Sequence, residues 1–108
     1  MNVNDDNIRT QMRKGILELC VLLTLSHGRA YPSDILRSLR QAGLSVVEGT
    51  LYTLLNRLRR DGHLDYEWEE STMGPPRKYY TLSESGQRLL EALMAEWKLI
   101  SDAISNFI

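Results

Sequence analysis

The sequence has few of the residues that metal centres and nucleophilic catalysis need. It contains one cysteine, Cys20, and two histidines, His27 and His63, in 108 residues. A single cysteine excludes an intramolecular disulfide and fits a reducing compartment. One cysteine and two distant histidines do not make a zinc site. A phosphate-binding glycine loop is also missing, so we expect no metal ion, no cofactor and no enzyme.

Long apolar runs are missing as well. The longest is GILELCVLLTL at residues 15–25, and it contains Glu18. A helix needs about 20 apolar residues to cross a bilayer, so this segment is too short. Residues 1–10 are polar and do not resemble a signal peptide. We therefore expect a cytoplasmic protein of one domain's size, with no membrane partner.

The chain lacks a net charge of either sign that would indicate its partner. The total is -1, but residues 29–60 contain six arginines and two acids, whereas residues 61–72 contain five acids and no base. Binding to nucleic acid requires a local basic surface, not a basic total. A nucleic-acid partner therefore stays open, and the acidic segment makes a protein partner the second hypothesis.

Apolar periodicity predicts three helices in the first part of the chain. A helix over residues 8–26 has an apolar residue every third or fourth position, and a second begins near Pro32 and stops before Gly43. The third is predicted to start at a capping box, SVVE at 45–48, and to end at Gly62. Its expected apolar face comprises Val47, Leu51, Leu54 and Leu58. The second and third helices form a helix-turn-helix candidate.

The period changes to strand spacing after Gly62. Apolar and acidic residues alternate over 64–69, STMGPP at 71–76 is a turn cluster, and RKYYTL at 77–82 is rich in strand formers. Ser83 can cap a last helix over 84–107. The expected fold is mostly α with a small β-hairpin (α+β). Residues 1–82 then contain the helix-turn-helix candidate and a hairpin at about 63–82, and residues 83–108 contain the last helix.

The outer face of the third helix suits a major groove. Gly49 permits close approach, Asn56 can pair with adenine, and Arg60 can meet guanine or phosphate. A polar outer face is also normal for any solvated helix. The hairpin adds Arg77 and Lys78 beside a stiff turn, where cations can reach phosphates. Together these features favour DNA binding. The alternative is a winged-helix protein-interaction module without specific DNA binding.

These segments resemble the PadR family of bacterial transcriptional regulators. The resemblance lies in GTLYTLLNRLRRDGHL (49–64), GPPRKYYTLSESG (74–86) and, more weakly, GILELCVLLTL. It implies a winged helix-turn-helix over residues 1–82, with the wing at about 63–82, and a C-terminal dimerisation helix over residues 83–108, as in the short branch of the family with one helix after the wing. The leading hypothesis is a repressor that binds double-stranded DNA as a homodimer on a palindromic operator. With the groove-facing residues above, the DNA-binding set becomes Lys14, Tyr31, Gly49, Thr50, Tyr52, Thr53, Asn56, Arg57, Arg60, Arg77 and Lys78.

A heptad seam on the last helix predicts a second copy of the chain as partner. The predicted dimer interface comprises Ile16, Leu19, Leu90, Leu93, Trp97, Ile100, Ile104 and Phe107. Trp97 has two interpretations. A large residue at a seam position usually packs the interface. The resemblance instead implies an opening at the dimer centre that takes a small, flat, hydrophobic effector, lined by Met12, Leu93, Trp97 and Ile100.

Overall fold

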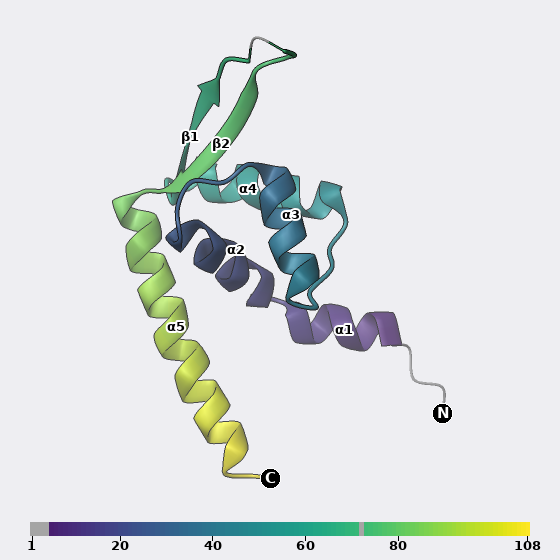
Figure 1. The fold of residues 1–108 in the computed structure, drawn as a ribbon. Coiled ribbons are helices and arrows are strands. Elements are labelled where there is room, and N and C mark those ends of the chain that lie inside the picture. The colour runs from purple at the N-terminus through teal and green to yellow at the C-terminus, as the bar shows by residue number, and fades with distance from the viewer. Residues whose placement is uncertain (1–4, 72) are drawn as a thin grey trace.

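The chain folds as five helices and one antiparallel hairpin in a computed structural model that describes residues 5–71 and 73–108. The mostly α, α+β fold is therefore confirmed (Figure 1). Residues 1–4 of the expected first unit, and Thr72 of the expected turn, lie outside the described residues. No helix in the described ranges is long and apolar enough to cross a membrane. The elements are α1 (Asp5–Arg13), α2 (Ile16–Ser26), α3 (Pro32–Gln41), α4 (Glu48–Arg60), β1 (Leu64–Glu69), β2 (Arg77–Leu82) and α5 (Glu84–Ser105).

The prediction of one continuous helix over residues 8–26 is wrong. Gly15 adopts a φ of +86°, a left-handed conformation that suits glycine and breaks the segment into α1 and α2. None of the α1 residues is buried, and Ile8 and Met12 are exposed. The apolar spacing is present in α1, but its apolar face is not buried by any described part of the chain.

The predicted start of α4 is also wrong. Val47, not Ser45, is the N-cap, and no side chain caps the helix. The Ser45 carbonyl instead accepts a 2.8 Å hydrogen bond from Arg13. Val47 has an extended backbone and is 71% exposed, so it lies off the apolar face, whereas Leu55 is fully buried. The core face of α4 therefore follows its buried residues Leu51, Leu55 and Leu58.

The core forms around α2, which packs against α3, α5 and β2. Both Val21 and Leu22 are fully buried, so α2 is covered on more than one side, as its wide apolar surface predicts. Tyr80 is the largest fully buried side chain. Its hydroxyl is the one buried side-chain polar atom in the described residues that has no hydrogen-bond partner.

The hairpin is attached to the turn between α2 and α3. β1 and β2 pair in the register Leu64↔Leu82 to Glu69↔Arg77. Ala30 bridges to Tyr80 through two backbone hydrogen bonds of 3.1 and 2.9 Å. The hairpin thus has a fixed base next to the helix-turn-helix, as a wing requires.

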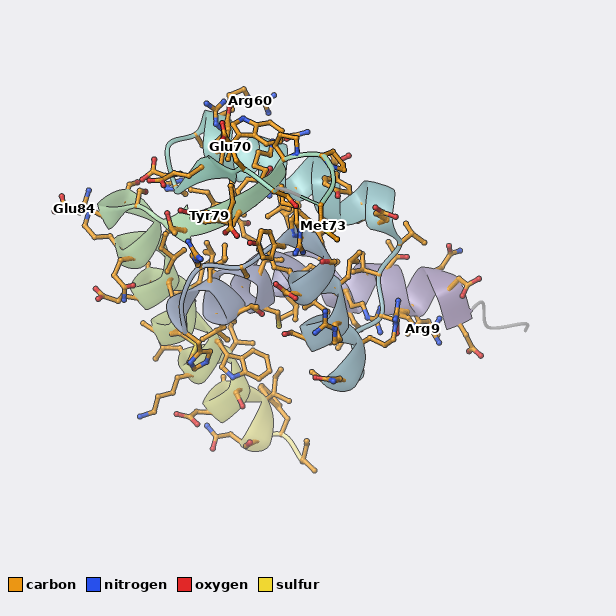
Figure 2. The ribbon with its side chains drawn as sticks, turned by 45° about the horizontal axis from the view of Figure 1, so that its top comes forward. Arg9, Arg60, Glu70, Met73, Tyr79 and Glu84 are labelled. Atoms are coloured by element: carbon orange, nitrogen blue, oxygen red, sulfur yellow. The ribbon has the colours of Figure 1, made fainter. Side chains whose placement is uncertain are left out.

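The start of α5 is fixed to the end of α4. The Ser83 hydroxyl accepts from the Gly86 N–H at 3.0 Å, which confirms the predicted cap, and it donates to the Gly62 carbonyl at 2.6 Å. Gly86 packs so closely on the His63 carbonyl that a Cβ there would overlap it. The helix ends at Ser105, two residues before the predicted limit. Its C-terminal half leaves the rest of the molecule (Figures 1 and 2).

Candidate nucleic-acid interface

The outer face of α4 is exposed where the sequence predicts a groove-reading surface. Asn56 and Arg60 project into solvent, and Arg60 is visible at the end of the helix in Figure 2. The Thr53 hydroxyl donates to the Gly49 carbonyl at 2.9 Å, so its oxygen lone pairs are the part it presents. The predicted groove-reading residues that are exposed on α4 are Gly49, Thr50, Tyr52, Thr53, Asn56 and Arg60. These groups supply donors, acceptors and a small residue on one helix face, which major-groove reading needs.

Arg57 is held differently from the other arginines of α4. Its Nη2 atom lies 3.5 Å from Glu18 Oε2, so it is tied to α2. Such a partly exposed pair contributes only about 0–1 kcal/mol, and a phosphate can compete for the guanidinium. Arg57 is therefore a flanking cation. Lys14, another residue of the predicted DNA-binding set, is exposed between α1 and α2.

The two wing cations point to opposite faces of the hairpin. Arg77 is exposed, and its guanidinium carbon lies 3.6 Å from the centroid of the Tyr31 ring. Lys78 is half-buried, with Nζ 4.4 Å from the Tyr66 centroid and 5.6 Å from that of Trp68. The guanidinium of Arg77 has no ion pair or side-chain hydrogen bond to any described residue, so its N–H donors are free for an anion.

Tyr31 joins both strands of the wing to the turn before α3. Its hydroxyl donates to Glu69 Oε2 at 2.6 Å, and its ring lies under Arg77. Glu69 and Arg77 are directly opposite in the hairpin register. The hydrogen bond to Glu69, with partial burial, raises the pKa of Tyr31 above its ordinary value, although Arg77 and Arg29 act in the opposite direction. Tyr31 therefore stays protonated and remains a donor at neutral pH.

Two acids of the acidic segment have polar partners within the chain. Glu69 also lies 3.4 Å from Arg29 Nη2, and Glu67 accepts from the Tyr79 hydroxyl at 2.8 Å. Tyr79 is seen on the hairpin in Figure 2. Glu69 thus ties the wing to the turn before α3, and Glu67 is hydrogen-bonded across the hairpin. This weakens the charge-based reason for a protein partner.

Sequence reasoning missed three residues of this surface: Arg29, Arg59 and Glu69. Arg59 places its guanidinium carbon 4.2 Å from the Tyr66 centroid, and Arg29 places its own 4.3 Å from that of Tyr79. The alternation of RKYYTL could have shown that Arg77 and Lys78 face opposite ways. The partners of Arg29 and Arg59 depend on tertiary packing and carry no local signal.

The predicted interface residues divide into two groups. Leu19 and Leu90 are buried within the chain itself, and Ile16 and Leu93 are half-buried. Residues Trp97, Ile100 and Ile104 are 47%, 51% and 52% exposed, while Met12 on α1 and Phe107 beyond α5 are exposed. The seam therefore continues the buried face of α5 past the end of the core.

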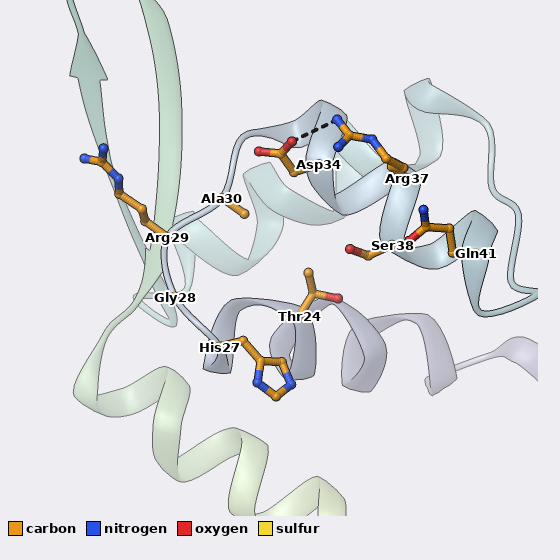
Figure 3. Close-up of a pocket in the computed structure, with 9 residues that line it drawn as sticks. All are labelled: Thr24, His27, Gly28, Arg29, Ala30, Asp34, Arg37, Ser38 and Gln41. Carbon is orange, nitrogen blue, oxygen red and sulfur yellow. Dashed lines mark hydrogen bonds and ion pairs between the residues drawn. The ribbon is translucent and has the colours of Figure 1, made fainter.

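Hollows in the surface lie between α2 and α3. One of about 390 Å³ is lined mainly by polar groups, including Asp34 paired with Arg37 at 3.0 Å (Figure 3). A neighbouring one of about 340 Å³ is more apolar and includes Cys20, whose pKa is raised by burial. Neither includes Trp97. No cluster of His, Cys, Asp and Glu in the described part of the chain suits a metal ion.

Comparison with known proteins identifies the family. Residues 21–92 match the transcriptional regulator PadR-like family. A PadR-like transcription factor from Bacteroides fragilis is 51% identical, with 94% of this chain and 99% of that one covered and a TM-score of 0.80. A PadR-like regulator from Bacillus cereus is 33% identical, with 90% and 95% covered and a TM-score of 0.81.

A third structure shares the fold at lower identity. Bacillus subtilis PadR in complex with operator DNA is 23% identical, with a TM-score of 0.68 over 73% of this chain and 46% of that one. The family match and the B. fragilis and B. cereus relatives establish the family without this third structure. This chain belongs to the PadR-like family of transcriptional regulators.

Proposed function

We propose that this protein represses transcription by binding a palindromic DNA operator as a homodimer in the cytoplasm. The observation that carries the proposal is the exposed polar face of α4 beside Arg77, whose N–H donors are free. In this assignment residues 1–82 bind DNA and residues 83–108 hold the dimer together. The operator complex of the B. subtilis relative supports DNA as the partner class.

The contacts divide into two kinds. Asn56, Thr53 and Tyr52 face base edges in the major groove, where amide and hydroxyl groups discriminate between bases. Arg60, Arg57 and Lys14 meet the flanking phosphates, which position the protein without reading sequence. Arg77 reaches the backbone from the wing, while Lys78 adds charge from among the aromatic rings.

Dimerisation follows from the exposed half of α5. Trp97, Ile100 and Ile104 form an apolar stripe at heptad spacing, which a second copy of the helix covers. Two-fold symmetry then places two α4 helices about 34–36 Å apart, one turn of DNA. The expected operator is therefore an inverted repeat.

Trp97 packs at the centre of this dimer. An aromatic effector would have to insert beside it, against Met12, Leu93 and Ile100. Titration of planar aromatic compounds into a Trp68→Phe variant, read by Trp97 emission, tests this directly. Saturable quenching would establish an effector site, whereas no quenching across a broad panel would leave Trp97 with a packing role only.

Selection of bound sites from a random duplex pool tests the proposal. We expect an inverted repeat to be enriched, and binding to it to weaken steeply with salt because phosphate contacts release counterions. Equal affinity for the enriched and random duplexes would contradict sequence-specific regulation. A chain that binds no duplex at low salt would favour the protein-interaction module.

A further inference from the structure

We infer that Tyr31 is a positioning residue that presents Arg77 to the DNA backbone and does not itself contact DNA. This inference rests on the proposed function. The hydroxyl of Tyr31 holds Glu69 on β1, and its ring lies under Arg77 on β2. One side chain from the turn before α3 thus contacts both members of the last cross-strand pair of the wing.

The ring of Tyr31 positions Arg77, and its hydroxyl positions Glu69. A guanidinium stacked on a phenol ring keeps its N–H groups at the edge of the stack, where they can meet a phosphate. Because the Tyr31 hydroxyl already donates its hydrogen bond to Glu69, it has no donor left for DNA. Arg29 adds a second contact to Glu69 at 3.4 Å.

The contact lies beyond the backbone bridge that anchors the wing. Ala30 and Tyr80 pair through their backbones at the base of the wing, and Tyr31 follows Ala30 directly. Glu69↔Arg77 is three residue pairs further out than Tyr66↔Tyr80. Tyr31 therefore restrains the outer part of the hairpin, where a two-stranded ribbon has little stability of its own.

Salt dependence separates positioning from direct contact. Arg77→Ala should lose about fivefold in affinity per protomer at physiological salt, and the slope of log K against log salt should fall by about one per protomer. Tyr31→Leu removes an uncharged group, so as a direct contact it would leave the slope unchanged. As a positioning residue it lowers the slope towards that of Arg77→Ala, and Tyr31→Phe, which keeps the ring, gives a smaller loss.

A double-mutant cycle supplies the second readout. If Tyr31 acts through Arg77, Tyr31→Leu costs little further affinity in the Arg77→Ala background. Tyr79→Phe is the matched control, because it removes the hydroxyl that donates to Glu67 across the hairpin and keeps the ring that Arg29 and Tyr31 contact. It should leave affinity and slope unchanged. Additive losses, or an unchanged slope for Tyr31→Leu, would overturn the inference.

Hydrogen exchange provides a test that needs no DNA. The Ala30 and Tyr80 amides should exchange faster in Tyr31→Leu than in the parent, while amides of α5 stay unchanged, and an equal exchange rate at the bridge would contradict the restraint. If the parent protein binds no duplex, the proposed function fails, and the exchange result alone decides whether Tyr31 restrains the wing.

Discussion

The wing and the C-terminal half of α5 both project from the core, but they differ in whether their side chains have partners within the chain. On the wing, Tyr66 receives the guanidinium of Arg59 and the ammonium of Lys78 within 4.2 and 4.4 Å. Beyond Leu93, no ion pair or ring contact among the described residues links the apolar side chains of α5 to another element. The cations of the wing thus have aromatic partners within one chain, whereas the apolar side chains at the end of α5 are about half exposed.

This difference indicates two kinds of partner. Polar and charged groups already paired within the wing can exchange those partners for phosphates at modest cost, so binding there can be reversible and salt-dependent. Burying a large apolar side chain such as Trp97 or Ile104 contributes about 1.5–3 kcal/mol each. The exposed half of α5 therefore suits an apolar partner that stays bound, as in the homodimer proposed above.

The largest expected effect comes from placing a charge in the seam. Ile100→Asp should dissociate the proposed dimer, because an unpaired buried charge costs about 3–5 kcal/mol. Light scattering after gel filtration measures the mass. Leu99→Asp is the control, since Leu99 is 64% exposed but lies about 100° around the helix from Ile100, off the seam. A dimeric Ile100→Asp protein would contradict the seam.

A substitution where the start of α5 packs on the end of α4 predicts a smaller effect, a loss of folding free energy. Gly86→Ala drives a Cβ into the His63 carbonyl, and such overpacking costs about 1–3 kcal/mol of folding free energy. Gly49→Ala is the matched control, because nothing lies near that position and it is in a helix. It should gain stability by about 0.5–1 kcal/mol. Urea unfolding of both variants measures the difference, and equal midpoints would argue against a tight junction.

Much of this architecture could be predicted from the sequence because local signals agree. Alternation over 64–69, the turn cluster and the Ser83 cap specify the hairpin and the start of α5 without reference to distant residues. The break at Gly15 and the start of α4 could not be predicted in the same way. A helical period continues across Gly15, and only a left-handed φ there reveals the break. The SVVE pattern fits a capping box, but Arg13 takes the Ser45 carbonyl instead.

The candidate site shows the same division. The polar face of α4 could be predicted, since the exposed side of an amphipathic helix follows from its period. The roles of Tyr31 and Glu69 could not, because their contact joins residues 38 positions apart. The opposite facing of Arg77 and Lys78, by contrast, could have been predicted from strand alternation, and the hairpin register agrees with it.

The base of the wing predicts a gain in stability. Tyr80→Phe removes a buried hydroxyl that has no partner among the described residues, and an unsatisfied buried group of this kind costs about 1–3 kcal/mol. Thermal unfolding should shift upward. Tyr79→Phe, which loses the bond to Glu67, should leave the midpoint unchanged or slightly lower. A destabilised Tyr80→Phe protein would mean that the hydroxyl has a partner in solution.

The two tryptophans report separately on the two regions, and they give the smallest effect. Trp97 lies on the seam of α5 and Trp68 on the wing. In Trp68→Phe, the remaining Trp97 emission should shift to the red on dilution, because dissociation of the dimer exposes the indole to water. In Trp97→Phe, Trp68 emission should not depend on protein concentration but should change when duplex DNA is added. If Trp68 emission depended on protein concentration, the wing would lie in the dimer interface. If Trp97 emission did not change across the dissociation range found by light scattering, the seam of α5 would not be that interface.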